Sequence, residues 1–332
     1  MGSKILHVEY YLPEKILTNS QLEDMFSDYS GQQIEEKVGI KERHIAGDDE
    51  TALDLAQKAA EKVFQKFDKN LIDYILLCTQ SPDYFIPTSA CILQDRLRLR
   101  TDIGALDYNL GCSGFIYGLS LAKGLIASGI GRNILLLTSE TYSKHIHAKD
   151  RANLAIFGDG AAATIITQSK QEQIFKFVLG TNGKGYKNLI VPNGGMRNKF
   201  QENAAEKKDH NGCIRTDNKL LMDGPEIFNF TISIIPKVVD RVLEVNNLEL
   251  KKIDYLIFHQ ANYFMLEHLR KKMKIPREKF YNNLEKTGNT VSATIPIALR
   301  DCMDKEIIRE GDIVLLVGFG VGYSWGGTII EI

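Results

Sequence analysis

An internal duplication constrains the fold of this chain more than any other feature of its sequence. Residues 72–77 (Ile-Asp-Tyr-Ile-Leu-Leu) recur at 253–258 as Ile-Asp-Tyr-Leu-Ile-Phe. Residues 157–160 (Phe-Gly-Asp-Gly) recur at 319–322 as Phe-Gly-Val-Gly, so the two matches keep the same order along the chain. Short matches in a shared order indicate two copies of one structural unit rather than two unrelated domains.

The two copies are expected at residues 1–170 and 171–332, each with the hydrophobic pattern of an α/β unit. Because two similar halves bring equivalent helix starts together at their seam, residues distant in sequence are expected to converge there. Short apolar runs predict strands at 74–78, 134–138, 255–258 and 313–317. Longer stretches with apolar residues at helical spacing predict helices at 53–67, 114–128, 226–245 and 291–305.

Composition argues against several classes of function. The 332-residue chain is long enough to bury a large core. Its 41 basic and 42 acidic side chains nearly cancel, so we expect no nucleic-acid partner. The N-terminal residues lack the pattern of a signal peptide, and no later stretch approaches ~18 consecutive apolar residues. We therefore expect a cytoplasmic protein without a membrane partner.

The cysteines and histidines predict neither a disulfide framework nor a metal site. The five cysteines are widely spaced, and no Cys-x-x-Cys pair occurs. His145 and His147 have no third ligand nearby and are expected at the surface, so no metal is predicted. The polar segment 198–218 is expected to be an exposed loop. Four cysteines are expected to act as small buried hydrophobic residues, namely Cys78, Cys91, Cys213 and Cys302.

Three side chains at junctions between loops and regular elements carry the candidate chemistry. Cys112 lies among small residues at the start of a predicted helix, where the helix dipole is expected to stabilise a thiolate. His259 follows the strand at 255–258, at the sheet edge where α/β folds place ligands. Asn289 precedes another predicted helix, which begins at an equivalent place, near Ser292. Each residue alone is ordinary, but together they supply a nucleophile and two hydrogen-bonding partners on the predicted seam.

The segments around these residues resemble the signatures of the β-ketoacyl-acyl-carrier-protein synthase III family. The similarity runs in family order from near residue 38 to residue 326, so it covers nearly the whole chain. It implies the α/β thiolase fold, a duplicated arrangement of five αβαβα layers, and a homodimer. The matching segments are Gly111-Cys112-Ser113-Gly114-Phe115, His259-Gln260-Ala261-Asn262, Gly288-Asn289-Thr290 and 318–326, with 38–43 and 157–161 in addition.

The resemblance implies a decarboxylative condensation in two half-reactions. Cys112 attacks the thioester of an acyl-coenzyme A or an acyl-carrier protein, and the backbone N–H groups of Cys112 and Gly320 stabilise the oxyanion. A malonyl-acyl carrier protein then loses carbon dioxide, and its enolate attacks the acyl group to give a β-ketoacyl product. His259 and Asn289 donate hydrogen bonds to the thioester carbonyl as the enolate forms. No bound cofactor is implied, because coenzyme A or phosphopantetheine arrives with the substrates.

Five further residues fall at substrate-binding positions of the family. Phe319 is expected beside Cys112, with a core role as the alternative, and Ile86 falls where the family closes the acyl pocket across the dimer. Arg151 preserves an arginine that contacts coenzyme A. Gln33 replaces the tryptophan that stacks on the adenine. Pro225 stands where an asparagine commonly contacts pantetheine.

The expected docking site for the carrier protein also departs from the family pattern. Phe264 replaces an arginine used for docking. A basic helix face nevertheless remains near the site and would suit an acidic carrier protein, with a merely solvated helix end as the alternative. These departures predict a specialised member, making a secondary metabolite or another unusual acyl product rather than initiating fatty-acid synthesis. The basic face consists of Arg270, Lys271, Lys272 and Lys274.

Three other functions are compatible with the same residues. One is an acyltransferase that passes the acyl group of Cys112 to an amine or alcohol, with His259 as general base. Another is a thioester hydrolase, in which the three residues deliver water to the acyl-enzyme. The third is a binding protein that has lost its chemistry. Asn289 favours carbon–carbon bond formation, since transfer to oxygen or nitrogen needs no site for an enolate.

Overall fold

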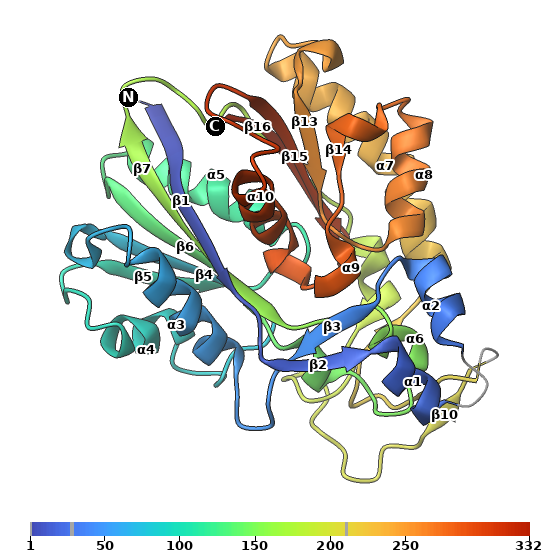
Figure 1. Ribbon diagram of the computed structural model, residues 1–332. Helices are drawn as coiled ribbons and strands as arrows, with labels where there is room; N and C mark the ends of the chain where they lie inside the picture. The colour runs from blue at the N-terminus through green and yellow to red at the C-terminus, as the bar shows by residue number, and fades with distance from the viewer. Residues whose placement is uncertain (1, 27–29, 210–211) are drawn as a thin grey trace.

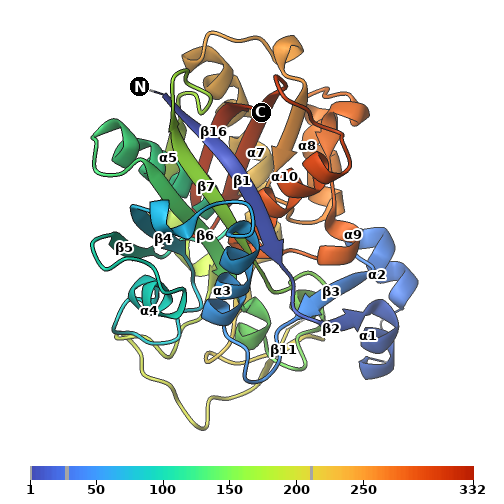
Figure 2. The ribbon, with the colours of Figure 1, turned by 60° about the vertical axis from the view of Figure 1, so that its left-hand side comes forward.

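Two five-stranded sheets of the same topology form the core of the computed structural model, which describes residues 2–26, 30–209 and 212–332 (Figures 1 and 2). The first sheet has the order β1-β7-β6-β4-β5 and the second has the order β8-β16-β15-β13-β14. The first consists of β1 (Gly2–Tyr11), β4 (Tyr74–Cys78), β5 (Gly104–Tyr108), β6 (Asn133–Glu140) and β7 (Gly160–Ser169). The second consists of β8 (Val178–Thr181), β13 (Tyr255–Phe258), β14 (Phe280–Tyr281), β15 (Ile313–Gly320) and β16 (Ser324–Glu331).

Strand directions repeat as well as strand order. β4 pairs in parallel with β5 and β6, just as β13 pairs in parallel with β14 and β15. The remaining pairs, β6 with β7 and β7 with β1, are antiparallel, as are β15 with β16 and β16 with β8. The duplicated α/β fold is therefore confirmed. The boundary between residues 170 and 171 stays a prediction.

The repeated Ile-Asp-Tyr motif has a structural role at the same place in both sheets. The Asp73 carboxylate accepts hydrogen bonds from the backbone N–H groups of Arg132, at 2.8 Å, and Asn133, at 3.1 Å. The Asp254 carboxylate accepts one from the N–H of Ile313 at 2.9 Å. Each aspartate thus satisfies a donor at the start of the neighbouring parallel strand, which would otherwise lack a partner.

Helices and the two sheets alternate in five layers. The buried helices α5 (Gly114–Ala127) and α10 (Thr294–Asp304) lie side by side between the two sheets (Figure 1). In β4, Leu76 faces this central layer, whereas Ile75 and Leu77 face α3 (Ala52–Val63) and α4 (Ser89–Arg96) on the outside. The second sheet is covered on its outer face by α7 (Gly224–Val245) and α8 (Tyr263–Lys272). Because both faces are covered, the central strands are continuous apolar runs.

Smaller elements surround one end of the layers, where the loops of both halves meet. The helices among them are α1 (Asn19–Met25), α2 (Gly31–Val38), α6 (Arg151–Leu154) and α9 (Leu284–Thr287). The strands among them are β2 (Lys15–Thr18), β3 (Glu42–Ile45), β9 (Leu189–Ile190), β10 (Lys207–Lys208), β11 (Ile214–Arg215) and β12 (Leu221–Met222).

The predicted strands and helices are present, with some differences at their ends. The strands at 74–78 and 255–258 match the predicted limits, while the strands predicted at 134–138 and 313–317 extend to Glu140 and Gly320. The helix predicted from 291 begins with a 3-10 turn at Val291–Ala293, and its α-helical part starts at Thr294. Val291 has a left-handed backbone with φ 56°, which is incompatible with the first turn of an α-helix.

Three expectations about exposure need correction. Cys91 is exposed rather than buried, unlike Cys78, Cys213 and Cys302. His145 and His147 are half-buried, and His145 packs edge-on against Tyr142 at 5.7 Å. The segment 198–218 is largely exposed, but β10 and β11 pair within it, and residues 210 and 211 of this expected loop lie outside the described residues.

Candidate active site

Cys112, His259 and Asn289 line one cavity of about 130 Å³. In the sequence, His259 lies 147 positions after Cys112 and Asn289 lies 177 positions after it. Cys112 lies in the loop between β5 and α5, His259 follows β13, and Asn289 follows α9. The loops that hold them come from both halves, because the two sheets place equivalent strand ends at the same end of the molecule. Phe319 and Gly320, at the end of β15, line the same cavity.

Cys112 packs directly against Gly320. A methyl group added to Gly320 would lie 2.9 Å from Cβ of Cys112, closer than real contacts allow, and 3.1 Å from its Sγ. A methyl group at Gly318 would lie 2.9 Å from Cα of Ser113. The hydroxyl groups of Ser113, which follows Cys112, and Ser324, at the start of β16, are 2.6 Å apart and buried. The glycines of β15 therefore allow backbone of the second half to approach the nucleophile loop of the first.

Burial raises the pKa of the Cys112 thiol to about 12, with the nearby Glu140 as a further cause. The helix α5 begins only at Gly114, two residues after the cysteine. This loss of hydration opposes the expected stabilisation of a thiolate by the helix dipole, an effect that extends little beyond the first turn. The thiol is protonated at rest.

Burial also keeps the His259 imidazole uncharged, lowering its pKa to about 3. The side chain is 2% exposed, and its Nδ1 lies 2.8 Å from Oγ1 of Thr294. The ring of Phe319 meets the imidazole edge-on, with 5.4 Å between centroids. Phe319 therefore both lines the cavity and fixes the plane of the imidazole.

The Asn289 carboxamide is oriented by backbone groups on both of its sides. Its Oδ1 accepts a hydrogen bond from the N–H of Val291 at 2.9 Å, and its Nδ2 donates to the carbonyl of Ala261 at 3.3 Å. Its backbone bridges to Phe157, with the N–H of Asn289 donating to the Ile156 carbonyl at 2.9 Å. Since an amide nitrogen carries two hydrogens, one remains available to a ligand in the cavity.

The rest of the cavity wall is mostly apolar. A site of this kind excludes water and accepts a narrow, largely apolar group beside the thiol. Its other lining residues are Ile156, Phe157, Leu189, Met222, Gly224, Ile227, Ala261, Asn262, Met265 and Val321.

The predicted substrate-binding residues other than Phe319 do not line this cavity. Ile86 is 86% exposed in the loop between β4 and α4, and Gln33 is exposed on α2. Arg151 begins α6 and lies near Gly212, 3.5 Å from where a methyl group on that glycine would be. Pro225 is exposed in the first turn of α7, beside the cavity residue Gly224.

The predicted basic face is less uniform than the sequence suggested. Arg270 is half-buried and forms a two-pronged ion pair with Glu267, at 2.8 and 2.9 Å, so its charge is neutralised within α8. Lys274 lies beyond the end of α8, with a left-handed backbone at φ 55°. Lys271 and Lys272 are exposed at the end of the helix.

Glu140, a fully buried carboxyl group near the cysteine, was not among the predicted site residues. Glu140 ends β6, and its oxygens accept hydrogen bonds from the N–H of Gln80 at 3.0 Å and the hydroxyl of Ser292 at 2.9 Å. Burial raises its pKa to about 8, so it is mostly uncharged at neutral pH. A charged residue at the end of the apolar run 134–138 was the available signal.

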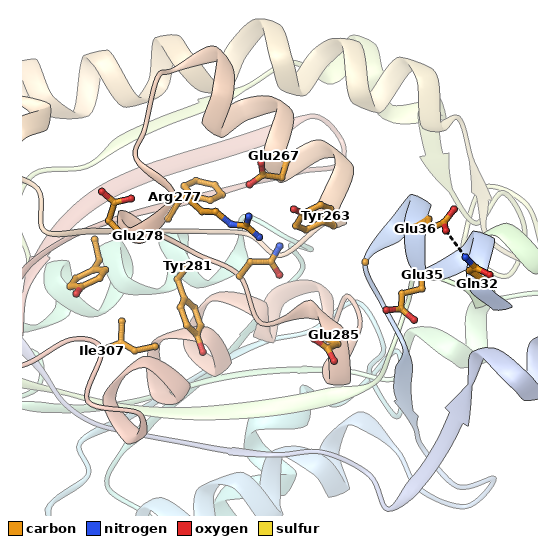
Figure 3. A pocket seen from close by; sticks show the side chains of 14 residues that line it. Gln32, Glu35, Glu36, Tyr263, Glu267, Arg277, Glu278, Tyr281, Glu285 and Ile307 are labelled. Carbon is orange, nitrogen blue, oxygen red and sulfur yellow. Dashed lines mark hydrogen bonds between the residues drawn. The ribbon is translucent and has the colours of Figure 1, made fainter.

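A larger cavity, of about 760 Å³, lies elsewhere and contains none of the three candidate residues (Figure 3). It opens between α2, α8 and the segment around β14. Its wall carries five glutamates and one arginine, namely Glu35, Glu36, Glu267, Glu278, Glu285 and Arg277. Size alone does not make it the reaction site, because it holds no candidate nucleophile.

The described residues contain neither a group of metal ligands nor a helix that could span a membrane. Across residues 2–26, 30–209 and 212–332, no three His, Cys, Asp or Glu side chains group as metal ligands would. Within the same ranges, no helix combines the length and apolarity needed to cross a membrane.

Two family models match the segments that carry the site. The 3-oxoacyl-[acyl-carrier-protein (ACP)] synthase III model matches residues 106–183, which include Cys112. The C-terminal model of the same family matches residues 243–332, which include His259 and Asn289.

Similar proteins with known sequences match along the whole chain. A β-ketoacyl-[acyl-carrier-protein] synthase III of Caldanaerobacter subterraneus is 40% identical and covers 100% of this chain and 98% of its own length. The protein of that name from Fusobacterium nucleatum is 38% identical, with 97% and 96% covered.

Solved structures give the same result. A crystal structure of a 3-oxoacyl-(acyl-carrier-protein) synthase III matches with a TM-score of 0.98 and 45% identity over 100% of both chains. A 3-oxoacyl-(acyl-carrier protein) synthase from Burkholderia xenovorans matches with a TM-score of 0.92 and 35% identity, over 100% of this chain and 94% of its own. The fold is the thiolase fold, and the chain belongs to the β-ketoacyl-[acyl-carrier-protein] synthase III family of condensing enzymes.

Proposed function

We propose that this protein condenses an acyl thioester with a malonyl-acyl carrier protein through an acyl-Cys112 intermediate, releasing carbon dioxide and a β-ketoacyl product. The observation that carries this proposal is the shared cavity, in which a thiol, an imidazole and a carboxamide face one apolar space. Coenzyme A or phosphopantetheine enters as part of the substrates. The family relationship supports the same reaction.

In the first half-reaction, the Cys112 sulfur forms a bond to the acyl carbon, and the bond from that carbon to the departing sulfur breaks. Because the thiol is protonated at rest, its proton leaves as the sulfur attacks rather than beforehand. His259, uncharged and in the same cavity, is the candidate acceptor, and the proton passes on to the departing thiolate. The N–H groups of Cys112 and Gly320 are the proposed oxyanion donors.

In the second half-reaction, the malonyl carboxylate leaves as carbon dioxide, and the enolate attacks the acyl carbon on Cys112. The negative charge that develops on the thioester oxygen needs donors that do not themselves change charge. The free Nδ2 hydrogen of Asn289 and the Nε2–H of His259 are the proposed donors. Apolar walls favour the step, because the malonyl carboxylate loses its hydration when it enters the cavity. This loss disfavours the charged carboxylate relative to the neutral carbon dioxide that it forms.

Intact-protein mass spectrometry tests the reaction. Wild-type protein incubated with short acyl-coenzyme A thioesters should gain one acyl mass, and Cys112→Ala should gain none. Addition of malonyl-acyl carrier protein should then remove the acyl mass and yield a β-ketoacyl-carrier product. Release of the acyl group as free acid would identify a hydrolase, and release only with an amine or alcohol would identify an acyltransferase. Absence of any acyl mass would indicate a binding protein that has lost this chemistry.

We also propose that the protein acts as a homodimer. β5 is an edge strand of the first sheet, so one of its sides has no neighbouring strand among the described residues. Tyr84, Phe85 and Ile86, in a loop of the same half, are 60%, 78% and 86% exposed. A contiguous apolar loop of this kind is typical of an interface. Sedimentation velocity should give twice the mass of one chain, and Phe85→Glu should lower it.

Donor and carrier recognition are proposed to differ from those of relatives with an adenine-stacking tryptophan. The exposed amide of Gln33 provides no aromatic surface for adenine, while Arg151 and the exposed Lys271 and Lys272 remain as cationic contacts. Gln33→Trp should therefore lower the KM for acyl-coenzyme A by ~5- to ~150-fold, as stacking is worth roughly 1–3 kcal/mol. An unchanged KM would mean that adenine binds elsewhere. A product assay with the purified protein would test whether it makes a specialised acyl product.

A further inference from the structure

The Thr294 hydroxyl lies between the candidate catalytic histidine and a backbone carbonyl. Its Oγ1 is 2.8 Å from Nδ1 of His259 and 3.0 Å from the carbonyl oxygen of Val291. Thr294 is 3% exposed and His259 is 2% exposed, so water has little access to either group. No other hydrogen-bond partner of His259 Nδ1 is present among the described residues.

A hydroxyl group has a single hydrogen, so these two contacts cannot both be donated by Thr294. When the hydroxyl donates to Val291, it must accept from Nδ1–H, which leaves the Nε2 of a neutral imidazole with a lone pair. When the hydroxyl donates to Nδ1 instead, the imidazole hydrogen is on Nε2. The direction of one hydroxyl group is therefore linked to the tautomer of His259.

Rotation between the two directions leaves no backbone group without a partner. The Val291 carbonyl also accepts a hydrogen bond from the backbone N–H of Thr294, so it stays satisfied when the hydroxyl turns away. Val291 can make these contacts because its left-handed backbone, with φ 56°, turns its carbonyl toward the start of α10. The same residue's N–H holds Oδ1 of Asn289. Both arrangements thus leave the Val291 carbonyl with a hydrogen-bond donor.

The two half-reactions need opposite tautomers. During acylation, Nε2 must have a lone pair to accept the Cys112 proton, which then passes to the departing thiolate and leaves the imidazole neutral. During decarboxylation, Nε2 must carry a hydrogen to donate to the thioester oxygen. Between the steps, one proton leaves Nδ1 and one adds to Nε2 through water that enters the cavity once the departing thiol has left, so the charge of the ring does not change.

We propose that Thr294 is a positioning residue that switches the tautomer of His259 between the two half-reactions by turning its hydroxyl from Val291 to Nδ1. This inference rests on the proposed function of His259. It assigns a role to a side chain that need not touch substrate, and it explains how one uncharged histidine serves first as acceptor and then as donor.

Nitrogen-15 spectra of histidine-labelled protein test the switch directly. The free enzyme should show His259 with hydrogen on Nδ1, and the acyl-enzyme with an unreactive malonyl thioester analogue should show hydrogen on Nε2. The resonance is assigned by its loss in His259→Gln. The same tautomer in both states would overturn the proposal, whereas the proposed function itself fails only if Cys112 acylation or the condensation product is absent.

Thr294→Val separates the switch from simple packing, because valine has nearly the same shape but no hydroxyl. A buried N–H without an acceptor is rarer than an acceptor without a donor, so the imidazole should hold its hydrogen on Nε2 in both states. Acylation of Cys112 should then fall by ~10–10²-fold, while carbon dioxide release by pre-acylated enzyme should fall by less than ~3-fold. Equal losses in both half-reactions, with a normal tautomer switch, would contradict the proposal.

Two further variants guard against a trivial loss of folding. Thr294→Ser keeps the hydroxyl and should restore both half-reaction rates and both tautomers. Thr231→Val is the matched control, because Thr231 is fully buried in α7 and its hydroxyl has no hydrogen-bond partner among the described residues. It should leave both rates unchanged. If Thr294→Val does not fold, the tautomers of Thr294→Ser still decide the question, since loss of its switch would contradict the proposal.

Discussion

The helix starts at Cys112 and at Ser292 occupy equivalent places in the two halves, yet they differ in access and in partners. Cys112 reaches a cavity, and its helix α5 begins directly two residues later. Ser292 is 1% exposed, lies in a 3-10 turn before α10, and donates its hydroxyl to Glu140 at 2.9 Å. In the first half, the Cys112 sulfur is open to substrate. In the second half, the Ser292 hydroxyl at the equivalent place is buried in the core.

This difference shows how a duplicated fold divides labour. The first half supplies the nucleophile Cys112. The second half supplies Phe319, Gly320 and the polar side chains of His259 and Asn289. Gly288 and Val291, both with positive φ, flank Asn289, and Asn289 lines the cavity whereas Ser292 does not. A local change in backbone conformation, rather than a change of topology, separates the two roles.

Gly320→Ala should have the largest effect, since it acts where the two halves touch. The new methyl group would lie 2.9 Å from Cys112 Cβ and would push the nucleophile away from the N–H groups proposed for the oxyanion. Loss of one oxyanion donor typically costs ~10²–10³ in rate, and displacement of the sulfur should add to this. Acylation measured by intact mass should therefore slow by more than ~10³-fold.

Gly124→Ala is the matched control for that substitution. Gly124 is exposed within α5, and a methyl group there would meet nothing within 4 Å. Alanine is favoured over glycine inside helices by roughly 1 kcal/mol, so the melting temperature should rise while acylation stays unchanged. If Gly320→Ala acylates at the wild-type rate, close contact between the halves is not needed for chemistry.

Asn289→Asp should break the second half-reaction and leave the first intact. Aspartate keeps the oxygen that accepts from Val291 but loses the Nδ2 donor, and its charge would repel an enolate. Carbon dioxide release from malonyl-acyl carrier protein should fall by ~10²–10³-fold, while acyl-Cys112 should still form. Asn289→Ala separates the charge from the lost donor. Equal loss of acylation in both variants would show that the division between halves is wrong.

Much of this comparison was predictable from residue patterns alone. The Ile-Asp-Tyr repeat located β4 and β13 because each aspartate is needed at the same hydrogen-bonding position beside the next strand. Small residues around Cys112 and the predicted seam between the halves placed the cysteine beside the second half, and Gly318 and Gly320 lie against its loop. Hydrogen-bonding and packing requirements of this kind depend on short segments, so they can be predicted from the sequence of those segments.

Properties that depend on packing between the halves were not predictable in the same way. The thiol of Cys112 loses its water to residues from both halves, so the sign of its pKa shift could not be read from its own helix. The left-handed backbone of Val291 runs against the preference of a β-branched residue, and no local pattern indicated it. Glu140 and Thr294 matter because of partners more than 30 residues away.

Glu140→Gln should change how stability depends on pH. Burial raises the pKa of Glu140 to about 8, so between pH 4.5 and 8 the folded protein holds a proton that the unfolded chain has lost. Stability is therefore greatest below the unfolded pKa and falls as the pH rises through this window. From pH 5 to pH 7 the wild type should lose about 2 to 3 kcal/mol relative to the variant, measured by urea unfolding. Parallel pH profiles would mean that Glu140 is ionised in the folded state.

Ser292→Ala should have the smallest effect, and it tests whether the second helix start has any role beyond its hydrogen bond to Glu140. Removing its hydroxyl leaves Glu140 with one donor fewer, at a cost of ~1–2 kcal/mol in the free energy of unfolding. Ser120→Ala is the control, because the Ser120 hydroxyl donates only to the carbonyl of Tyr117 within α5. Acylation should change little in either variant. The cost of Ser292→Ala should shrink in the Glu140→Gln background, since the two side chains form one contact. Loss of acylation comparable to that of Gly320→Ala would instead show that both helix starts take part in the chemistry.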